Sequence, residues 1–316
     1  MVYKKIDVIL ACYNGEKFID KQIRSILASL DATNGYMSRV LIADDGSNDN
    51  TISIISEIKD ERVVLIDSTR VGGVIKNFSR LINYSDADYV FFSDQDDVWL
   101  QEKISVFMNR FIALEKECSN TPILLHSDVT LVDAELNLLN ASMMNAQKII
   151  SQPSFAELLV SNSITGCAMA VNRPLLNTLT TLSDDRVVMH DWYLALIAKY
   201  FGILDLIPGS FVLYRQHGGN QVGSKIYGIR GKISPQKLIG FLRTSHRNVE
   251  RSLAQAHFFY SQYKTARVAT ENKNDLTLYV SSSNSMLSKI KVLSSGRFRK
   301  MGKVRNFIYK IIYLTM

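Results

Sequence analysis

Apolar and polar positions follow two different rhythms along the first part of the chain. Short continuous apolar runs, typical of buried strands, are separated by segments in which apolar residues recur at helical spacing. The expected strands are residues 6–11, 39–43, 63–66 and 89–92, and the expected helices between them are residues 16–30, 49–58 and 74–84. Single helices between strands indicate βαβ units. We therefore expect an α/β fold whose mostly parallel sheet carries helices on both faces.

After residue 100 this rhythm loosens. We expect helices at 103–114 and 192–200 and from about residue 174, strands at 123–126, 166–171 and 211–214, and a hairpin-like excursion over 130–139. The glycine-rich stretch 218–231 favours a flexible loop, and from residue 235 onward the pattern is helical without strand alternation. The chain therefore divides into an α/β domain over residues 1–220, a flexible loop over 221–231 and a helical C-terminal region over 232–316.

Polar side chains follow each of the first four expected strands. Ligands of an open parallel sheet bind outside the carboxyl ends of its strands, so these groups should meet at one edge. The four segments are Cys12-Tyr13-Asn14-Gly15-Glu16, Asp44-Asp45-Gly46-Ser47, Arg70-Val71-Gly72-Gly73 and Ser93-Asp94-Gln95-Asp96-Asp97. Their convergence is a stronger signal than any one motif.

The acidic segment with Asp94, Asp96 and Asp97 is the centre of this edge. Carboxylates this close repel each other unless a cation lies among them, and hard oxygen ligands suit Mg²⁺ or Mn²⁺. The alternative is a solvated acidic turn before the next helix. Its position directly after a buried strand favours the metal site.

The segment after the second strand has two interpretations. One is a turn that caps the following helix, and the other is a binding segment at the cleft. We expect both, with Asp45 or Ser47 turning the chain while Asp44 points into the cleft. The first strand is followed by neither the GxGxxG of a dinucleotide-binding domain nor the GxxxxGK[ST] of a P-loop.

Two later segments add candidate chemistry. Asp191, at the start of an expected helix beside His190 and Trp192, is ionised at neutral pH and could act as a general base. The alternative is a helix N-cap with Trp192 in the core. After the last strand, Arg215 could clamp phosphate, and His217 could complete a metal site or bind diphosphate, although a lone histidine is more often structural.

The composition excludes several classes of protein. With 316 residues, 47% of them hydrophobic, the chain can bury a sizeable core and is not disordered as a whole. No apolar run approaches the roughly 20 residues that span a bilayer, and the N-terminus does not resemble a signal peptide. Cys12, Cys118 and Cys167 are scattered, as in a cytosolic protein with reduced thiols and no zinc site.

Charge is divided unequally along the sequence. Residues 1–220 carry a net charge of −8 and residues 221–316 a net charge of +15, with no acidic residue after Asp275. A region this basic favours an anionic partner, either a nucleic acid or a membrane surface. No recognised nucleic-acid-binding motif accompanies the charge, so we expect no nucleic-acid partner.

The end of the chain has the pattern of an amphipathic basic helix, typical of a segment in a membrane interface. The apolar positions are Phe298, Met301, Val304, Ile308, Ile311 and Ile312, and the opposite stripe is Arg299, Lys303, Asn306 and Lys310. Eight basic residues between 289 and 310 would favour anionic lipids. The alternative is a helix docked on the α/β domain. We expect a cytoplasmic protein that lies peripherally on the inner face of the cell membrane.

These motifs, in this order over roughly residues 6–220, resemble the inverting family 2 glycosyltransferases of the GT-A fold, a Rossmann-like fold that binds nucleotide-diphospho-sugars. By that resemblance Asp44 contacts the nucleotide base, Asp94 contacts the ribose or the metal, and Asp96 binds the metal. Asp97 lines the sugar site and Gln95 is a donor-binding residue, while Arg215 and His217 grip the diphosphate and metal. The other donor-binding positions are Ala11, Tyr13, Asn14, Glu16, Arg70, Gly73 and Asn77.

The resemblance also implies a mechanism. Asp191 is the base, because His190 stands where the family usually has a first acid, and His190 and Trp192 lie on the acceptor side. Asp191 takes a proton from an acceptor hydroxyl, which displaces the nucleoside diphosphate and inverts the anomeric carbon.

The residues of these motifs most resemble those of bacterial rhamnosyltransferase-like members of the family, which build surface polysaccharides. This implies a dTDP-rhamnose donor, or otherwise a UDP-hexose, and a lipid-linked saccharide acceptor, in O-antigen or capsule synthesis. A non-catalytic nucleotide-sugar-binding scaffold is the main alternative. A nucleotidyltransferase fits less well, because Cys12–Glu16 offers no basic, glycine-rich phosphate loop.

Overall fold

A computed structural model describes residues 3–217 and 235–316 of the chain. The flexible loop expected over 218–231, including the predicted boundary at 221–231, lies outside these residues. No helix in the described part is both long enough and apolar enough to cross a bilayer.

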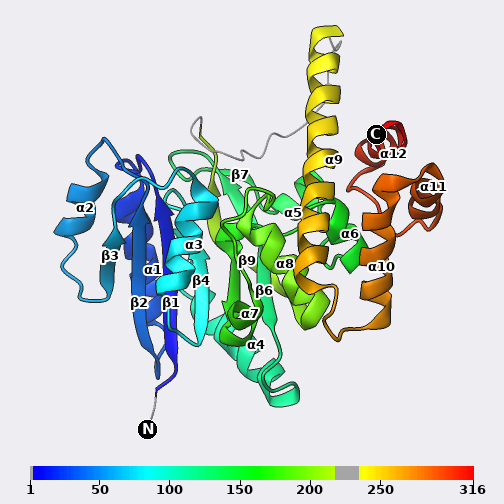
Figure 1. Cartoon of the computed structure of the whole chain (residues 1–316). Helices are drawn as coiled ribbons and strands as arrows, with labels where there is room; N and C mark the ends of the chain where they lie inside the picture. The colour runs from blue at the N-terminus through cyan, green and yellow to red at the C-terminus, as the bar shows by residue number, and fades with distance from the viewer. Residues whose placement is uncertain (1–2, 218–234) are drawn as a thin grey trace.

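One mixed sheet forms the centre of the fold (Figure 1). Its order is β3-β2-β1-β4-β8-β6-β9-β5, with β7 paired to β6. β3, β2, β1 and β4 are parallel neighbours, whereas β8 runs antiparallel between β4 and β6. The strands are β1 (Lys5–Cys12), β2 (Met37–Asp44), β3 (Val63–Asp67), β4 (Tyr89–Ser93), β5 (Val98–Trp99), β6 (Ile123–Val132), β7 (Leu138–Asn140), β8 (Met169–Asn172) and β9 (Ile203–Arg215).

Helices cover both faces of this sheet, as the sequence predicts. Side chains along a strand alternate between faces, so in β1 Val8 and Leu10 pack on one side and Ile9 and Ala11 on the other. The first side carries α1 (Ile19–Asp31), α2 (Thr51–Glu57) and α4 (Lys103–Glu117); the second carries α3 (Val74–Tyr84), α6 (Phe155–Val160), α7 (Arg173–Thr178) and α8 (His190–Phe201).

The four N-terminal strands and the three helices between them agree with the expected elements to within a few residues, as does the antiparallel excursion of β6 and β7. The later elements differ. β9 begins at Ile203 rather than near 211, because Pro208 and Gly209 interrupt the apolar pattern where its register with β6 shifts. Residues 166–168 are a short 3₁₀ helix before β8. The pattern also missed β5, α5 (Met143–Gln147) and α6, which are all shorter than seven residues.

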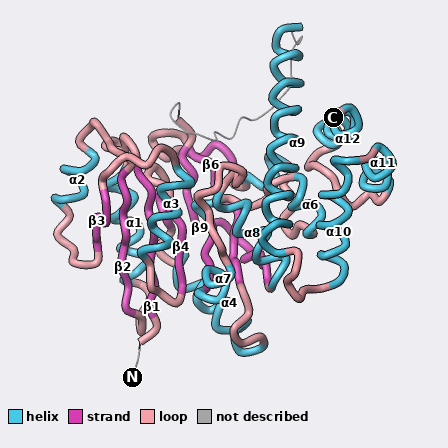
Figure 2. Tube along the Cα trace, viewed as in Figure 1, coloured by secondary structure: helices cyan, strands magenta, loops and turns pink. Residues whose placement is uncertain are grey.

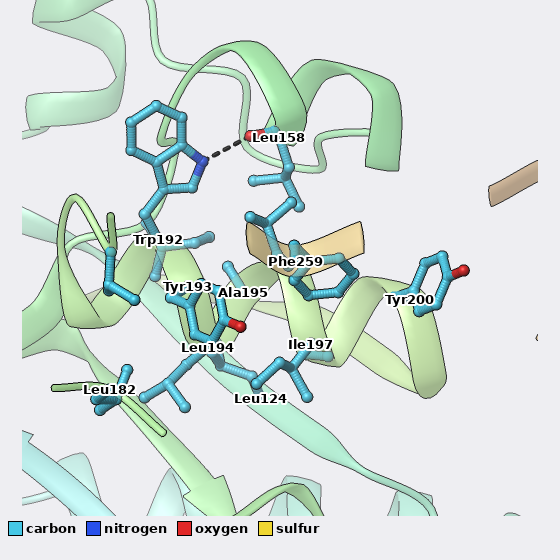
Figure 3. Packing of buried hydrophobic residues seen from close by; sticks show 14 of the residues in the cluster. Leu124, Leu158, Leu182, Trp192, Tyr193, Leu194, Ala195, Ile197, Tyr200 and Phe259 are labelled. Carbon is cyan, nitrogen blue, oxygen red and sulfur yellow. Dashed lines mark hydrogen bonds between the residues drawn. The ribbon is translucent and has the colours of Figure 1, made fainter. Parts of the chain in front are cut away.

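The C-terminal region is helical, as expected, and packs against the α/β part (Figures 1 and 2). Its helices are α9 (Pro235–Tyr263), α10 (Thr270–Ser281), α11 (Met286–Ser294) and α12 (Lys303–Thr315). Phe259 of α9 lies 5.8 Å from Tyr193 and 5.2 Å from Tyr200 of α8, ring centre to ring centre (Figure 3). One hydrophobic core therefore continues from the sheet into these helices.

The expected apolar stripe near the C-terminus is divided in the structure. α12 begins only at Lys303, and the residues before it form a connecting segment. Phe298 and Ile312 are buried in the core, while Val304 and Ile311 remain exposed. The docked-helix alternative is thus correct for one side of α12, because Tyr309 and Tyr313 add a buried aromatic side that the predicted stripe did not include.

Candidate active site

A cavity of about 410 Å³ opens at the carboxyl ends of the parallel strands. One part of its wall is polar and comes from the segments after β1, β2 and β4 and from the start of α3. The other part is richer in methionine and isoleucine and includes Met143, Ile149, Ile164, Met189 and Met301. Of the expected site residues, the described wall contains Ala11, Tyr13, Gly73, Asn77, Asp94, Gln95, Asp96, His190 and Asp191.

Gln95 joins the first and fourth strand ends. Its side chain accepts a hydrogen bond from the backbone N–H of Tyr13 at 2.8 Å and donates one to the carbonyl of Tyr13 at 3.0 Å. A Cβ at Gly15 would lie 2.5 Å from Gln95 Oε1, so glycine is needed for this close approach. The amide of Gln95 therefore holds the loop after β1 against the acidic segment after β4.

The second strand end differs from the expectation. Asp44 is almost fully buried, and its carboxylate accepts hydrogen bonds from the backbone and hydroxyl of Ser47, so Asp44 holds the turn. Asp45 lines the cavity instead. The expectation that Asp44 faces the cleft is therefore not met, because the turn at Gly46 (φ 76°) needs the Asp44 carboxylate. Contact between Asp44 and a nucleotide base stays a prediction.

Asp45 organises the loop before α3. Its carboxylate accepts the backbone N–H groups of Val71 at 2.5 Å, Gly72 at 2.9 Å and Gly73 at 2.7 Å. Burial alone would raise the pKa of Asp45, but the hydrogen bonds from Gly73, Gly72 and Val71 outweigh it and hold that pKa below its usual range. Gly72 and Gly73 have φ values of 83° and 118°, which a side chain would strain.

Three of the expected donor-binding residues lie beside the cavity rather than in its wall. Asn14 Oδ1 accepts from the backbone of Asn48, and Glu16 accepts from the backbone and side chain of Asn50. These two residues therefore tie the first loop to the second. Arg70 is exposed, with its guanidinium 5.9 Å from the ring centre of Tyr13 at the cavity rim.

Asn77 is a buried polar residue in the cavity wall. Its side-chain amide donates to the carbonyl of Ala43 at 2.8 Å, and its Oδ1 accepts from Arg80 Nε at 2.7 Å. The side chain of Asn77 thus fastens α3 to the end of β2, where the Asp44–Asp45 turn begins.

The acidic segment divides between the cavity and the protein interior. Asp94 and Asp96 line the cavity, whereas Asp97 is fully buried and accepts the backbone N–H of Arg215 at 3.1 Å. Burial first, and then the charges of Asp96 and Asp191, raise the pKa of Asp94 to about 7. Burial also raises the pKa of Asp97 well above its usual range. Direct contact of Asp97 with the sugar stays a prediction, and its position in the structure is beneath the wall.

A buried lysine lies under this segment. Lys103 is fully buried, donates to the carbonyl of Cys167 at 2.7 Å, and places its ammonium 3.3 Å from the centre of the Trp99 ring. Burial lowers the pKa of Lys103 to about 7, although the charges of Asp97 and Asp94 oppose this. Ligand atoms of Asp94, Asp97 and Cys167 lie within 4.8 Å of one another and could hold a metal ion.

The structure brings Asp96 and His217 together. His217 Nε2 lies 2.7 Å from Asp96 Oδ2. Arg215 is buried, and its guanidinium donates to the backbone carbonyls of Asp96, at 2.7 Å, and Ala134. Arg215 therefore fastens the end of β9 to the acidic segment; a phosphate contact by Arg215 stays a prediction.

The first turn of α8 supplies another part of the cavity wall. Asp191 is 6% exposed and accepts from its neighbour's backbone N–H at 2.6 Å. Burial raises the pKa of Asp191 to about 6, against hydrogen bonds from Trp192, Asn162 and Gly166. Trp192 itself packs in the core and donates from Nε1 to the carbonyl of Leu158 at 2.6 Å (Figure 3). A contact of Trp192 with the acceptor stays a prediction.

His190 is held as a neutral ring beside Asp191. Its ring centre lies 4.0 Å from that of Phe78 and 5.6 Å from that of Phe92. Burial lowers the pKa of His190 to about 3, and neither ring nitrogen has a hydrogen-bond partner among the described residues. A buried polar group of this kind costs about 1–3 kcal/mol unless a ligand satisfies it.

A family model decides the identity of this site. The model described as "Glycosyl transferase family 2" matches residues 7–180, which is more than half of the chain. The chain belongs to glycosyltransferase family 2. Its members transfer a sugar with inversion of the anomeric carbon, so the cavity is that of an inverting glycosyltransferase.

Similar proteins agree with this membership. The transferase is 29% identical over 235 residues to the dTDP-rhamnosyl transferase RfbG of Shigella flexneri, covering 69% of this chain and 74% of RfbG. It is 26% identical over 190 residues to WfgD of Escherichia coli, a UDP-Glc:α-D-GlcNAc-diphosphoundecaprenol β-1,3-glucosyltransferase, covering 60% and 67% of the two chains.

A solved structure has the same fold. Residues 1–349 of TarS from S. aureus, crystallised with UDP-GlcNAc, align with a TM-score of 0.50 at 16% identity, over 98% of this chain and 90% of that one. The expected GT-A fold is therefore confirmed.

Sequence reasoning missed several residues of the glycosyltransferase site. Asn162, Gly166 and Met301 line the cavity, although Gly166 was expected only as part of a strand and Met301 only as part of an apolar stripe. The signal for Asp45 was present, since it adjoins Asp44, but the pattern could not say which carboxylate turns the chain. Lys103 lies on the apolar side of the expected 103–114 helix, and this position was the signal that could have predicted its burial.

Proposed function

We propose that this transferase moves a sugar from a pyrimidine nucleotide donor to a lipid-linked saccharide during synthesis of a bacterial O-antigen or capsule. The donor that fits best is dTDP-rhamnose, because RfbG is named for that activity and covers most of the chain. A UDP-hexose is the second choice, since WfgD is named for UDP-glucose and a diphosphoundecaprenol acceptor. An acceptor of this kind favours a place at the inner face of the cell membrane.

One observation carries the proposal. Asp191 lines the same cavity as Asp94 and Asp96 and lies close enough for its charge to raise the pKa of Asp94. A donor whose diphosphate lies at the acidic segment would therefore turn its sugar toward Asp191. A carboxylate whose pKa is about 6 is ionised at neutral pH and still basic enough to receive a proton.

The proposed reaction is a direct displacement. Asp191 takes the proton of an acceptor hydroxyl, and that oxygen bonds to the anomeric carbon from the face opposite the nucleotide. The bond between that carbon and the diphosphate oxygen breaks, so the configuration inverts and the nucleoside diphosphate leaves with the electron pair. Asp191 is buried in the cavity wall, which limits the access of water to the proposed reacting centre.

The residues at the acidic segment suit a divalent cation. Asp94 and Asp96 face one cavity, and mutual repulsion contributes to the raised pKa of Asp94. A hard cation relieves such repulsion, and carboxylate oxygens suit Mg²⁺ or Mn²⁺. Asp96 and His217 would hold the ion, with Asp94 beside them. The ion would stabilise the charge of the leaving diphosphate.

The proposal is tested with nucleotides and one pair of variants. Thermal unfolding and donor hydrolysis are measured with UDP-, dTDP- and GDP-sugars, each with Mg²⁺, Mn²⁺ or EDTA. We expect stabilisation by dTDP- or UDP-sugars that requires the cation. Asp191→Asn should lower turnover by at least about a thousandfold and leave nucleotide binding intact. Asp185→Asn, in an exposed acid just before the same helix, is the matched control.

Two results would contradict the proposal. A folded protein that responds to none of the pyrimidine nucleotides would favour a scaffold without catalysis. Near-normal turnover by Asp191→Asn would place the base elsewhere.

A further inference from the structure

Two neighbouring helices at the C-terminal end leave a set of large apolar side chains exposed. Six such residues are between 48% and 73% exposed: Met286, Leu287 and Ile290 of α11, and Val304, Phe307 and Ile311 of α12. At about 3.6 residues per turn, each trio lies on one side of its helix. We call these six residues the α11–α12 face. α11 and α12 contact each other and lie together at one edge of the molecule (Figure 1).

The opposite sides of both helices are part of the core. Val292 of α11 and Tyr309, Ile312 and Tyr313 of α12 are at most 7% exposed. Both helices are therefore packed on the core through their buried sides, and the exposed trios are on the sides that face away from it. Exposed apolar side chains that gather on one surface mark a contact site more often than singly scattered ones do.

Positive charge borders the same face. Lys289 and Lys291 lie beside the α11 trio, and Lys303 and Lys310 lie beside the α12 trio. No acidic side chain in residues 3–217 or 235–316 is within ion-pair distance of these four lysines. Nearby arginines differ, since Arg297 pairs with Asp275 and Arg299 with Glu157. The charge of the lysines is therefore available to an external partner.

We infer that the α11–α12 face docks on an anionic lipid bilayer, with its apolar side chains in the interface and its lysines at the headgroups. Apolar residues bordered by lysine are the pattern of segments that lie in a membrane surface. A second copy of this chain fits less well. A two-fold contact places the same surface on both sides, so these lysines would oppose each other.

The connection from this face to the cavity is short. Met301, in the segment between α11 and α12, lines the cavity, and its Sδ lies 3.4 Å from the backbone nitrogen of Ile150. Arg299 Nε bonds Glu157 Oε1 at 2.6 Å, and Glu157 closes the capping box of α6. The segment that joins the two helices of the face thus contributes directly to the methionine-rich part of the cavity. The docking inference deepens the proposed function. It depends on that function only for the lipid-linked acceptor.

The test is flotation of the full chain with vesicles. One set is phosphatidylcholine alone, and the other is phosphatidylcholine and phosphatidylglycerol in equal parts. We expect flotation only with the anionic vesicles, weakening as salt rises. Phe307→Ser with Ile311→Ser should reduce the bound fraction at least about tenfold. Each substitution removes the favourable free energy of transferring an apolar side chain from water into the membrane interface. Lys303→Glu with Lys310→Glu should have a similar effect at low salt.

The control substitutes two exposed leucines at a distance, Leu138→Ser and Leu139→Ser on β7, and should float as the unchanged chain does. Donor hydrolysis without lipid should be equal in all these variants, which separates a failure of docking from a failure of the proposed function. The inference is overturned if the unchanged chain does not float with anionic vesicles or if Phe307→Ser/Ile311→Ser floats equally well. Light scattering that shows a dimer lost in this variant would instead assign the face to self-association.

Discussion

Replacing Gly166 by alanine tests how Asp191, the proposed base, is positioned. An added Cβ would lie 2.8 Å from His190 Nε2 and 3.1 Å from its Cε1, although ordinary contact begins at 3.4 Å. The overlap with Nε2 is thus about 0.6 Å. The His190 ring cannot retreat freely, because Phe78 lies 4.0 Å behind it, centre to centre. The first turn of α8, which carries Asp191, must therefore shift.

The expected magnitudes follow from this overlap. Overpacking of one methyl group in a filled core costs about 1–3 kcal/mol of unfolding free energy. A base displaced by a fraction of an ångström should lower turnover by roughly tenfold to a hundredfold. Gly240→Ala is the control, since a Cβ there meets nothing within 4 Å.

The assay is a double-mutant cycle with His190→Ala, read by chemical denaturation and by donor turnover. Removing the ring makes room for the methyl group, so Gly166→Ala should cost at least about 1 kcal/mol less in that background. Equal costs in both backgrounds, or unchanged stability and turnover in Gly166→Ala alone, would refute the argument that this glycine positions Asp191.

Three other predictions concern the carboxylates. Turnover should fall as pH drops through about 6, because the raised pKa of Asp191 makes it protonated and unable to act as a base below that value; a pH–rate profile that stays flat from pH 5 to pH 8 would contradict this. Asp96→Ala should abolish cation-dependent stabilisation by nucleotide, measured by thermal unfolding with Mn²⁺ and with EDTA, and unchanged affinity would reject the metal assignment. Asp45→Asn should lower the unfolding free energy at pH 7 by about 1–2 kcal/mol. Because the folded-state pKa of Asp45 is depressed, its contribution is present above the unfolded-state pKa of about 3.9 and lost as pH falls through the folded value, so the two proteins should converge in acid denaturation.

The sequence predicted the N-terminal half of the fold because local signals agree there. The apolar runs of β1, β2 and β4 are buried on both faces, and residues 74–84 form a helix with the expected bounds. β9 could not be predicted in full, since its first half pairs with β6 across a register shift and has a proline. Its length depends on tertiary pairing rather than on its own pattern.

The site was predictable as a set of strand ends but not in its details. Polar residues after β1 and β4 do meet in one cavity. Which carboxylate of the Asp44–Asp45 pair faces the cavity depends on the backbone N–H groups of residues 71–73, which lie on a different loop. Likewise, no local pattern could place Met301 in the cavity, because its position results from the packing of α12 on the fold.

The continuous core between α8 and the C-terminal helices limits how this enzyme can be recombined with its relatives. Phe258 of α9 stacks on Tyr193 and Phe259 meets the same ring edge-on, and the nearby His190 and Asp191 line the cavity. A chimera that exchanged only the helices after residue 234 would leave these rings against foreign partners. Hybrid enzymes should therefore exchange α6, α8 and the C-terminal helices, which pack on one another, as one block.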